Sequence, residues 1–336
     1  MSSSLFMIII TILMSTIVVY GGGRSNSSID PQLAEAEAGA KVISVRKDGR
    51  GQFETVTDAL NSIPEWSNTR WIVCIGRGEY WEKITIQKSK PFVTLYAKPW
   101  DMPVIVFNGT AADFGTWNSA TFAVESDNFV AVNIVFKNSA PEPDGKRIGA
   151  QAVAMRISGD KAAFYGCKFI GFQDTLCDDH GRHFFHKCHI QGTIDFIFGD
   201  GRSIYLETTI ESVAKKRGVM TAQGRDSVYD NSGYVFLKCK FTGSGKMQLG
   251  RAWRKWSRVV VADSYMDSVV DPAGWSDFGD PDSDQTVYYG EYKNEGPGAD
   301  MTDRVKYARR LLDEEANQFV TSDFIDAKTW LLPPPP

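Results

Sequence analysis

Two aspartates occupy the same place in a pattern that occurs twice in the chain. Asp174 follows residues 165–171 (YGCKFIG) and Asp195 follows residues 186–192 (HKCHIQG), so each landmark recurs after 21 residues. A constant offset of this kind is typical of two successive coils of one repeating structure, with the two side chains stacked. Carboxylates on adjacent strands, about 4.8 Å apart, repel each other, and the pKa of one of them rises. The pair therefore predicts a proton donor beside an ionised nucleophile or base.

Neighbouring polar residues favour acyl transfer as the chemistry of this pair. Gln173 directly precedes Asp174, and Gln151 lies about one coil upstream. Neutral amides beside a carboxylate pair stabilise a developing oxyanion, which acyl transfer requires. Arg251 would keep one aspartate ionised, and Trp253 offers a flat apolar face to a sugar ring.

Three other interpretations use the same region. The aspartates could form a structural turn ladder that only bonds backbone amides. They could also cleave a glycosidic bond, since retaining glycosidases hold two carboxyl groups about 5 to 5.5 Å apart. A metal site is a third idea, but the segment has the pattern of turn and strand, where alternate side chains point in opposite directions. We therefore expect no metal at the four histidines, which are His180, His183, His186 and His189.

The repeated pattern extends along most of the chain and predicts the fold. Short segments rich in Val, Ile, Phe and Tyr are separated by Gly, Pro, Asn or Asp, as in an all-β protein. A fixed coil with loops of variable length indicates a single-domain parallel β-helix, with an antiparallel sandwich as the alternative. Equivalent positions recur every 20 to 33 residues, at Ile134, Cys167, Cys188, Thr208, Cys239 and Ser264.

Helical periodicity occurs near both ends of the repeat. Residues Phe53–Ile63 carry apolar side chains at helical spacing and are followed by Pro64, which predicts a capping helix over the first coil. A second helix is expected from Thr302 to about Asn317. Its apolar face would consist of Val305, Ala308, Leu311 and Leu312.

The N-terminal residues resemble a secretory signal. Residues 5–20 are apolar and are followed by three glycines, which predicts a signal peptide over 1–23, with a signal anchor as the alternative. A polar linker over 24–40, a catalytic domain over 41–332 and a proline tail over 333–336 complete the expected organisation. The sequons at Asn26 and Asn108 fit a secreted glycoprotein.

The net charge restricts the kinds of binding partner that we expect, and the number of cysteines restricts the disulfides. The formal net charge is -4 and no basic run occurs, so nucleic acid is not expected as a partner. Five cysteines leave at least one unpaired. Cys167, Cys188 and Cys239 occupy repeat positions, which favours small apolar residues in an interior row, although one disulfide is compatible with the sequence.

Five motifs occur in order along the chain, namely GEYWEK at 78–83, GAQAV at 149–153, GFQDTL at 171–176, GTIDFIFG at 192–199 and LGRAW at 249–253. Together they give the chain a resemblance to the plant pectin methylesterases over roughly residues 42–332. The resemblance implies a right-handed parallel β-helix that hydrolyses the methyl ester of galacturonate in pectin and releases methanol. It also implies a secreted cell-wall enzyme that needs no cofactor.

The resemblance also implies a role for each residue of the site. Asp195 matches the nucleophile, and Asp174 matches the group that protonates the departing methanol and then acts as base on water. Gln151 and Gln173 match the oxyanion hole, and Arg251 matches the cation that holds the nucleophile. The expected sugar groove consists of Trp253 and Trp275, with Phe172 and Phe196 as weaker candidates.

The implied partners are methylated homogalacturonan and proteinaceous pectinesterase inhibitors, and the implied state is a monomer. Only the linker separates the expected signal from the catalytic domain, so the chain resembles the short class that lacks an inhibitor-like pro-region. A non-catalytic pectin-binding wall protein is the other function considered. No residue of the expected constellation is missing, which favours the enzyme.

Overall fold

The computed structural model describes residues 29–334 of the chain. The expected signal peptide and the sequon at Asn26 lie outside the described residues. No helix within 29–334 is long and apolar enough to cross a membrane.

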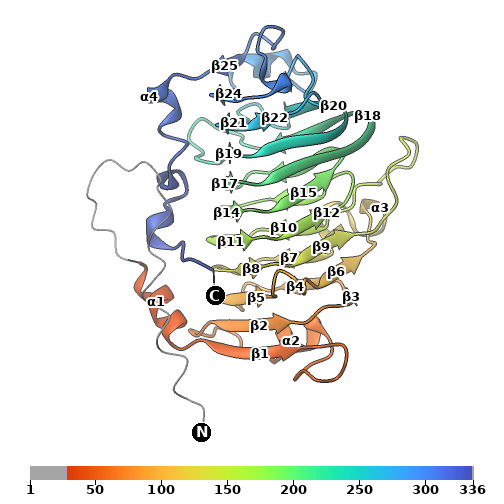
Figure 1. Ribbon diagram of the computed structural model, residues 1–336, viewed down its shortest axis with the longest axis vertical. Coiled ribbons are helices and arrows are strands. Elements are labelled where there is room, and N and C mark those ends of the chain that lie inside the picture. Colours follow the sequence, from red (N-terminus) through yellow and green to blue (C-terminus); the bar gives the residue numbers. More distant parts are fainter. Residues whose placement is uncertain (1–28, 335–336) are drawn as a thin grey trace.

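The chain winds into stacked coils whose strands form two parallel sheets (Figure 1). The first sheet has eleven strands, and each is parallel to its neighbours. In order across the sheet they are β1 (Lys41–Val45), β2 (Trp71–Ile75), β5 (Val93–Tyr96), β8 (Val130–Val132), β11 (Ala162–Tyr165), β14 (Arg182–His186), β17 (Arg202–Leu206), β19 (Gly233–Leu237), β21 (Arg258–Ala262), β24 (Tyr288–Tyr292) and β25 (Ala308–Arg310).

The second sheet has two arms that are joined because β18 and β20 are long enough to run along both. The first arm contains β3 (Glu79–Trp81), β6 (Val104–Phe107), β9 (Val135–Asn138), β12 (Lys168–Ile170) and β15 (His189–Gly192). The second contains β4 (Ile84–Ile86), β7 (Phe122–Val124), β10 (Met155–Ile157), β13 (Leu176–Asp178) and β16 (Ile194–Gly199). The joining strands and their partners are β18 (Thr209–Gln223), β20 (Lys240–Ala252), β22 (Tyr265–Met266) and β23 (Trp275–Ser276).

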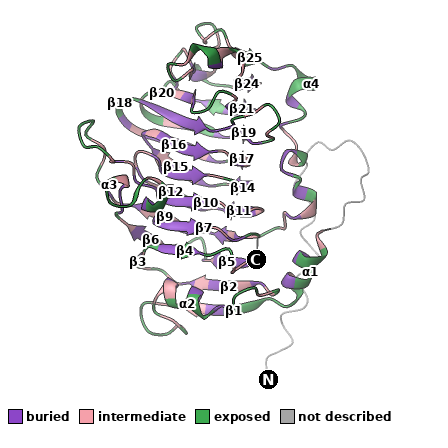
Figure 2. Ribbon diagram, turned by 180° about the vertical axis from the view of Figure 1, so that it is seen from behind, coloured by how far each residue is buried: buried purple, intermediate pink, exposed green. Residues whose placement is uncertain are grey.

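The repeat register predicted from the sequence is confirmed by the strand pairing. Phe136, Phe169, Ile190, Ile210, Phe241 and Met266 pair in turn on six successive coils. Each lies two residues after a predicted repeat position and is buried in the interior. Alternation along each strand thus sends one row of apolar side chains inward on every coil, and Figure 2 shows the resulting buried strands.

The cysteine row is also confirmed. Cys167, Cys188 and Cys239 lie in the interior cluster, and all five cysteines of the chain are free thiols in the structure. Burial raises the pKa of Cys167 to about 12, because a thiolate would lose its hydration there. These residues are therefore inert packing groups.

The expected capping helix is present as α2 (Val56–Ser62). It begins three residues later than predicted because the side chain of Thr55 accepts a hydrogen bond from the Asp58 amide and caps it. Val56, Ala59 and Leu60 are buried against the first coil.

The range expected as a linker contains a helix, α1 (Pro31–Ala38), capped by Asp30. Leu33 and Ala36 pack with the outer face of the eleven-stranded sheet and with residues 311–332 of the C-terminal segment. The Asp30 amide also donates a hydrogen bond to the Thr329 carbonyl. The residues from Asp30 onward therefore belong to the folded unit.

The C-terminal helix predicted over Thr302 to Asn317 is wrong over most of its length. Only α4 (Asp313–Ala316) is helical, and Ala308–Arg310 forms β25. The apolar residues predicted to share one helix face have different environments. Ala308 packs on the interior cluster, Leu311 packs on the outer-face cluster, and Leu312 is exposed. One helix face could not reach both clusters, so tertiary packing overrides the periodicity.

The remaining elements are single turns. They are α3 (Ala111–Phe114) and the 3₁₀ helices η1 (Trp117–Ser119), η2 (Pro281–Gln285), η3 (Pro297–Ala299), η4 (Ser322–Ile325) and η5 (Ala327–Thr329).

Candidate active site

The two aspartates lie where the second sheet changes arms, on successive coils. Asp174 stands between β12 and β13, and Asp195 stands at the start of β16. The Asp174 amide donates a hydrogen bond to the carbonyl of Ile194, 3.0 Å away, which joins the two coils at this corner. The predicted stacking of the two residues is confirmed.

Both aspartates adopt a left-handed backbone conformation. The φ angle is +64° at Asp174 and +49° at Asp195. Residues other than glycine rarely adopt positive φ, and Asp tolerates it better than most. The pairing of β16 with β18 also shifts register between Ile194 and Ile197. Such irregularities re-aim side chains beside functional sites, and here they turn the carboxylates away from the strand pattern.

Arg251 distinguishes the two carboxylates. Its Nε donates to Asp195 Oδ1 at 2.7 Å, and a second nitrogen donates to Oδ2, so the contact is bidentate. Arg251 comes from β20, where it pairs with Ala222 of β18. A bidentate guanidinium fixes both the charge and the orientation of a carboxylate. Among the described residues, none donates a side-chain hydrogen bond to the Asp174 carboxyl group.

Burial and nearby charges give Asp174 and Asp195 different pKa values. Asp174 and Asp195 are 8% and 7% exposed. Burial, followed by the nearby charge of Asp195, holds the pKa of Asp174 well above its usual range. Burial also raises the pKa of Asp195, but the hydrogen bond and charge of Arg251 oppose that rise. Asp174 is therefore the better proton carrier, and Asp195 the better anion.

The two glutamines lie beside the aspartates on adjacent coils. The Ala152 amide donates to the Gln173 carbonyl at 3.2 Å, which places Gln151 next to Gln173 across the coils. The Gln151 carbonyl is held in turn by the Ala111 amide at 2.8 Å. The side-chain amides of both glutamines form no hydrogen bond with any residue in 29–334. Both can therefore donate to an oxyanion.

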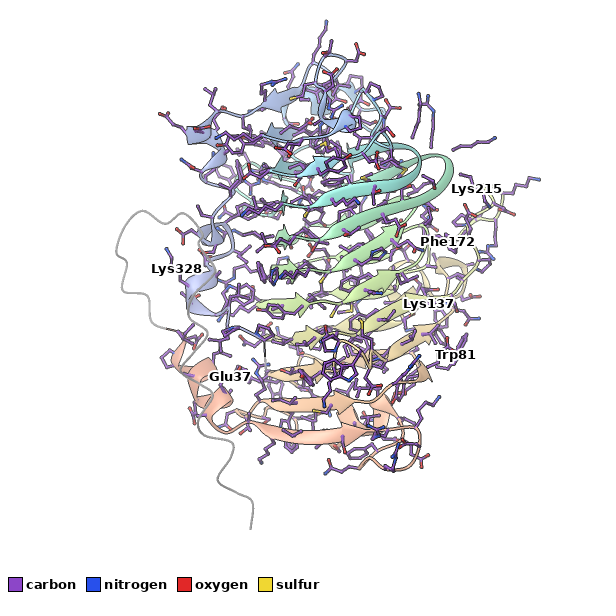
Figure 3. All side chains as sticks on the ribbon, viewed as in Figure 1. Glu37, Trp81, Lys137, Phe172, Lys215 and Lys328 are labelled. Carbon is purple, nitrogen blue, oxygen red and sulfur yellow. The ribbon has the colours of Figure 1, made fainter. Side chains whose placement is uncertain are left out.

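The expected aromatic residues divide into exposed and buried ones. Trp253 is 41% exposed and packs edge-on against Phe198. Phe172 is half-buried and lies at the edge of the molecule opposite Lys328 of the C-terminal segment (Figure 3). Both can contact a ligand.

Trp275 and Phe196, expected to line the groove, lie in the interior instead. Trp275 is 1% exposed, stacks on Tyr289 at 4.4 Å between ring centroids, and donates its indole N–H to Glu291. It pairs with Gly250, one residue before Arg251, so alternation turns it inward. Phe196 is fully buried in the same interior cluster, within the register shift of β16.

Phe278 is a site residue that the sequence reasoning missed. It is 48% exposed, and its ring centroid lies 4.0 Å from Arg251 Cζ, within cation–π range. It follows Trp275 by three residues in a loop rich in Asp and Gly. Because irregular loops carry no periodicity, the sequence held no signal beyond the presence of an aromatic residue.

The histidines do not converge. His183 is fully buried, whereas His186 and His189 lie near Glu207 and Glu211 at the surface. Within residues 29–334, no group of three or more His, Cys, Asp or Glu side chains could hold a metal ion.

Comparison with known proteins gives a consistent match over most of the chain. A family model described as Pectinesterase matches residues 42–328. Putative pectinesterase 63 of Arabidopsis thaliana is 53% identical over 293 residues, which span 87% of this chain and 87% of that protein. Pectinesterase 2 of Olea europaea is 47% identical over 310 residues, or 92% of this chain and 85% of that protein.

Solved structures agree with the sequence matches. Pectin methylesterase from carrot superimposes with a TM-score of 0.81 at 33% identity, covering 87% of this chain and 97% of that one. A pectin methylesterase in complex with a hexasaccharide has a TM-score of 0.74 at 25% identity, covering 87% and 98%. With the coils, the aspartate pair and the bidentate arginine all present, this chain belongs to the pectinesterase family.

Proposed function

We propose that this protein hydrolyses the methyl esters of galacturonate in pectin, with Asp195 as nucleophile and Asp174 as acid and base. The observation that carries the assignment is the asymmetry between the carboxylates. Asp195 is clamped by Arg251, while burial and the Asp195 charge favour a proton on Asp174. Nucleophilic and general acid catalysis need one group in each of these states.

The first half of the reaction forms an acyl-enzyme. An Asp195 oxygen attacks the ester carbonyl carbon, and the Gln151 and Gln173 amides donate to the oxyanion that develops. The C–O bond to the methoxy group then breaks, and Asp174 gives its proton to that oxygen. Methanol leaves, and the galacturonate carbonyl is joined to Asp195 as an anhydride.

The second half regenerates the enzyme. The Asp174 carboxylate takes a proton from water, and the hydroxide attacks the galacturonate carbonyl carbon. The bond to the Asp195 oxygen breaks, which releases the carboxylic acid of the sugar and restores Asp195 as an anion beside Arg251. The acid then loses its proton to solvent and becomes galacturonate carboxylate. Asp174 is protonated again for the next cycle.

The polymer is proposed to bind along the outer face of the second arm. Trp253 and Phe278 flank Arg251 there, and an outer row of small or apolar side chains in strand register lies beneath them. The related enzyme solved with a hexasaccharide supports an oligosaccharide ligand for this fold. The outer row contains Ala123, Cys177, Phe198 and Ala222.

The remaining proposals concern the setting of the enzyme. We infer that residues 1–23 direct secretion to the cell wall and that the enzyme acts there as a monomer. Proteinaceous pectinesterase inhibitors are proposed as partners. Support comes from the apolar N-terminal stretch and from the family to which the chain belongs.

Methanol release and polymer length together test the proposed activity. Purified protein is incubated with highly methylated pectin, and methanol is assayed while the size distribution of the polymer is followed. We expect methanol to accumulate at constant polymer length. Shortening of the polymer without methanol would instead indicate a glycosidase acting through the same carboxylates.

A further inference from the structure

A second cluster of ionisable residues is buried at the end of β13 that lies farther from Asp174. The Asp178 carboxylate contacts His183 Nδ1 at 2.5 Å through Oδ1, and its Oδ2 accepts a hydrogen bond from the Tyr205 hydroxyl at 2.5 Å. Asp178, His183 and Tyr205 are all 0% exposed. The Asp178 carbonyl also accepts a hydrogen bond from the Tyr234 hydroxyl at 2.9 Å. The proposed reaction uses none of these groups.

The hydrogen bonds of His183 define its protonation state. Its Nε2 lies 2.9 Å from the Gly159 carbonyl oxygen, which can only accept, so Nε2 carries a hydrogen. Its Nδ1 faces a carboxylate oxygen, and the other oxygen of that carboxylate already accepts from Tyr205. A hydrogen on Nδ1 as well would make His183 an imidazolium, and the two oxygens of Asp178 would then accept from His183 and from Tyr205.

The surrounding charges agree with an imidazolium. Burial alone would lower the pKa of His183, but the charge and hydrogen bond of Asp178, with Asp160 further away, raise it above the usual value. Other ionisable groups also interact with the cluster, namely Asp179, Asp200, Tyr234, Cys177 and Cys239. The carboxylate fits because residue 201 is glycine, where a Cβ would lie 2.2 Å from Asp178 Oδ1.

This cluster lies at the far end of β13, the strand that follows Asp174, and beside the far end of β16, the strand that carries Asp195. Asp178 ends β13, four residues after Asp174, and Gly199 ends β16, four residues after Asp195. The two ends touch, since the Gly201 amide donates to the Asp178 carbonyl at 3.0 Å, and a Cβ on Gly199 would lie 2.0 Å from that carbonyl. His183 of β14 and Tyr205 of β17 contact Asp178 at this point, and these two strands are neighbours in the other sheet (Figure 1).

We propose that Asp178, His183 and Tyr205 form a buried charged positioning cluster that fixes β13 and β16 relative to each other, and thereby sets the separation of Asp174 and Asp195. β13 has only three residues, so little chain lies between the cluster and Asp174. A buried ion pair depends steeply on geometry, because each charge has lost its hydration and is stable only against its partner. This inference rests on the proposed roles of the two aspartates.

The kinetic test uses Asp178→Asn and His183→Gln, each of which leaves a buried polar group without its charged partner. A shift of the catalytic pair alters the transition state more than substrate binding. We expect kcat to fall by about tenfold to a hundredfold while KM stays within about twofold.

Two control variants separate positioning from loss of stability. Phe185→Leu alters packing on β14 without changing charge, and should lower the melting temperature while kcat is retained. His186→Gln replaces a half-buried imidazole on the same strand that lies outside the cluster, and should change neither. If kcat of Asp178→Asn equals that of the wild type, or if Phe185→Leu loses kcat in proportion to its stability, the positioning role is wrong.

A spectroscopic test addresses the charge itself. In protein labelled with ¹⁵N-histidine, the His183 ring should show two protonated nitrogens at pH 8. His186 should be neutral there, because burial lowers its pKa. A single protonated nitrogen on His183 would overturn the ion pair. Methanol release by the wild type is measured alongside. An inactive wild type would refute the proposed function. If the wild type is active, the kinetic and spectroscopic results test the positioning cluster alone.

Discussion

At the scale of single residues, Asp174 and Asp195, the proposed catalytic pair, differ in their partners and hardly in their burial. Both are almost enclosed, but only Asp195 has a guanidinium bonded to both oxygens. The sequence predicted the pair, the glutamines and the arginine from spacing and chemical type. It could not predict which aspartate the arginine binds, because that contact joins strands that lie 56 residues apart. The family resemblance supplied that assignment.

Replacing Arg251 by Lys should move the acidic limb of the activity profile. The nucleophile must be ionised, and Arg251 opposes the rise in the pKa of Asp195 that burial causes. An ammonium group cannot reproduce the bidentate contact, so the pKa of Asp195 should rise further. The acidic limb of kcat/KM is expected to shift upward by roughly one pH unit. The profile is measured by methanol release, with the exposed neighbour Arg254→Lys as control. An unchanged acidic limb would show that Arg251 does not tune the nucleophile.

Replacing Asp174 by Asn should stabilise the fold while removing activity. Burial raises the pKa of Asp174 in the folded state above its unfolded value. The free energy of unfolding therefore falls as pH rises from the ordinary aspartate pKa through the raised one. Asparagine tolerates positive φ and carries no charge, so the variant escapes this loss.

At pH 7 the gain in the free energy of unfolding is expected to be at least about 1 kcal/mol, since one pKa unit corresponds to about that energy. Urea unfolding at pH 4 and pH 7 gives the measurement. The control is Asp263→Asn, an exposed aspartate that also has positive φ. A gain equal to that of the control would contradict a raised pKa at Asp174.

At the scale of elements, the sequence predicted the strands that follow the repeat, and it failed for segments outside the repeat. The coil register follows from apolar residues at constant offsets, and α2 follows from helical spacing ended by proline. The segment after Thr302 also has helical spacing, but Arg304 is buried there in an ion pair with Glu291 at 2.8 Å. Long-range contacts of this kind leave no local periodicity. The inward position of Trp275 likewise depends on its pairing with Gly250.

A ladder of stacked rings stabilises the coils beneath the active site. Phe164, Phe185, Tyr205 and Phe236 lie on four successive strands, with 4.5 to 4.8 Å between neighbouring ring centroids. Phe185→Ala would leave a cavity in the middle of this ladder. We expect a loss of about 3 to 5 kcal/mol in the free energy of unfolding, measured by urea denaturation. Phe114→Ala, at a partly exposed ring, should cost much less. Similar losses in both variants would show that the ladder has no special role.

At the scale of the whole molecule, the terminal segments cover the sheet that carries none of the proposed catalytic residues. Helix α1 and residues 311–332 pack on the outer face of the eleven-stranded sheet (Figure 1). Asp326 bonds Arg202 of β17 at 3.0 Å, and the Tyr165 hydroxyl donates to the Leu332 carbonyl. The corner with Asp174 and Asp195 lies on the second sheet and is left open to a polymer. One face of the β-helix is thus covered by its own chain, while the face proposed to bind the substrate lies on the other sheet.

The most direct test of the account is the rate of methanol release by Asp195→Asn on highly methylated pectin, compared with the wild type and with Asp263→Asn. The account predicts a fall in kcat of at least about a thousandfold for Asp195→Asn, because an amide cannot act as the nucleophile. Circular dichroism and pectin binding should be unchanged, and Asp263→Asn should keep wild-type kcat. Activity of Asp195→Asn close to that of the wild type would contradict the mechanism.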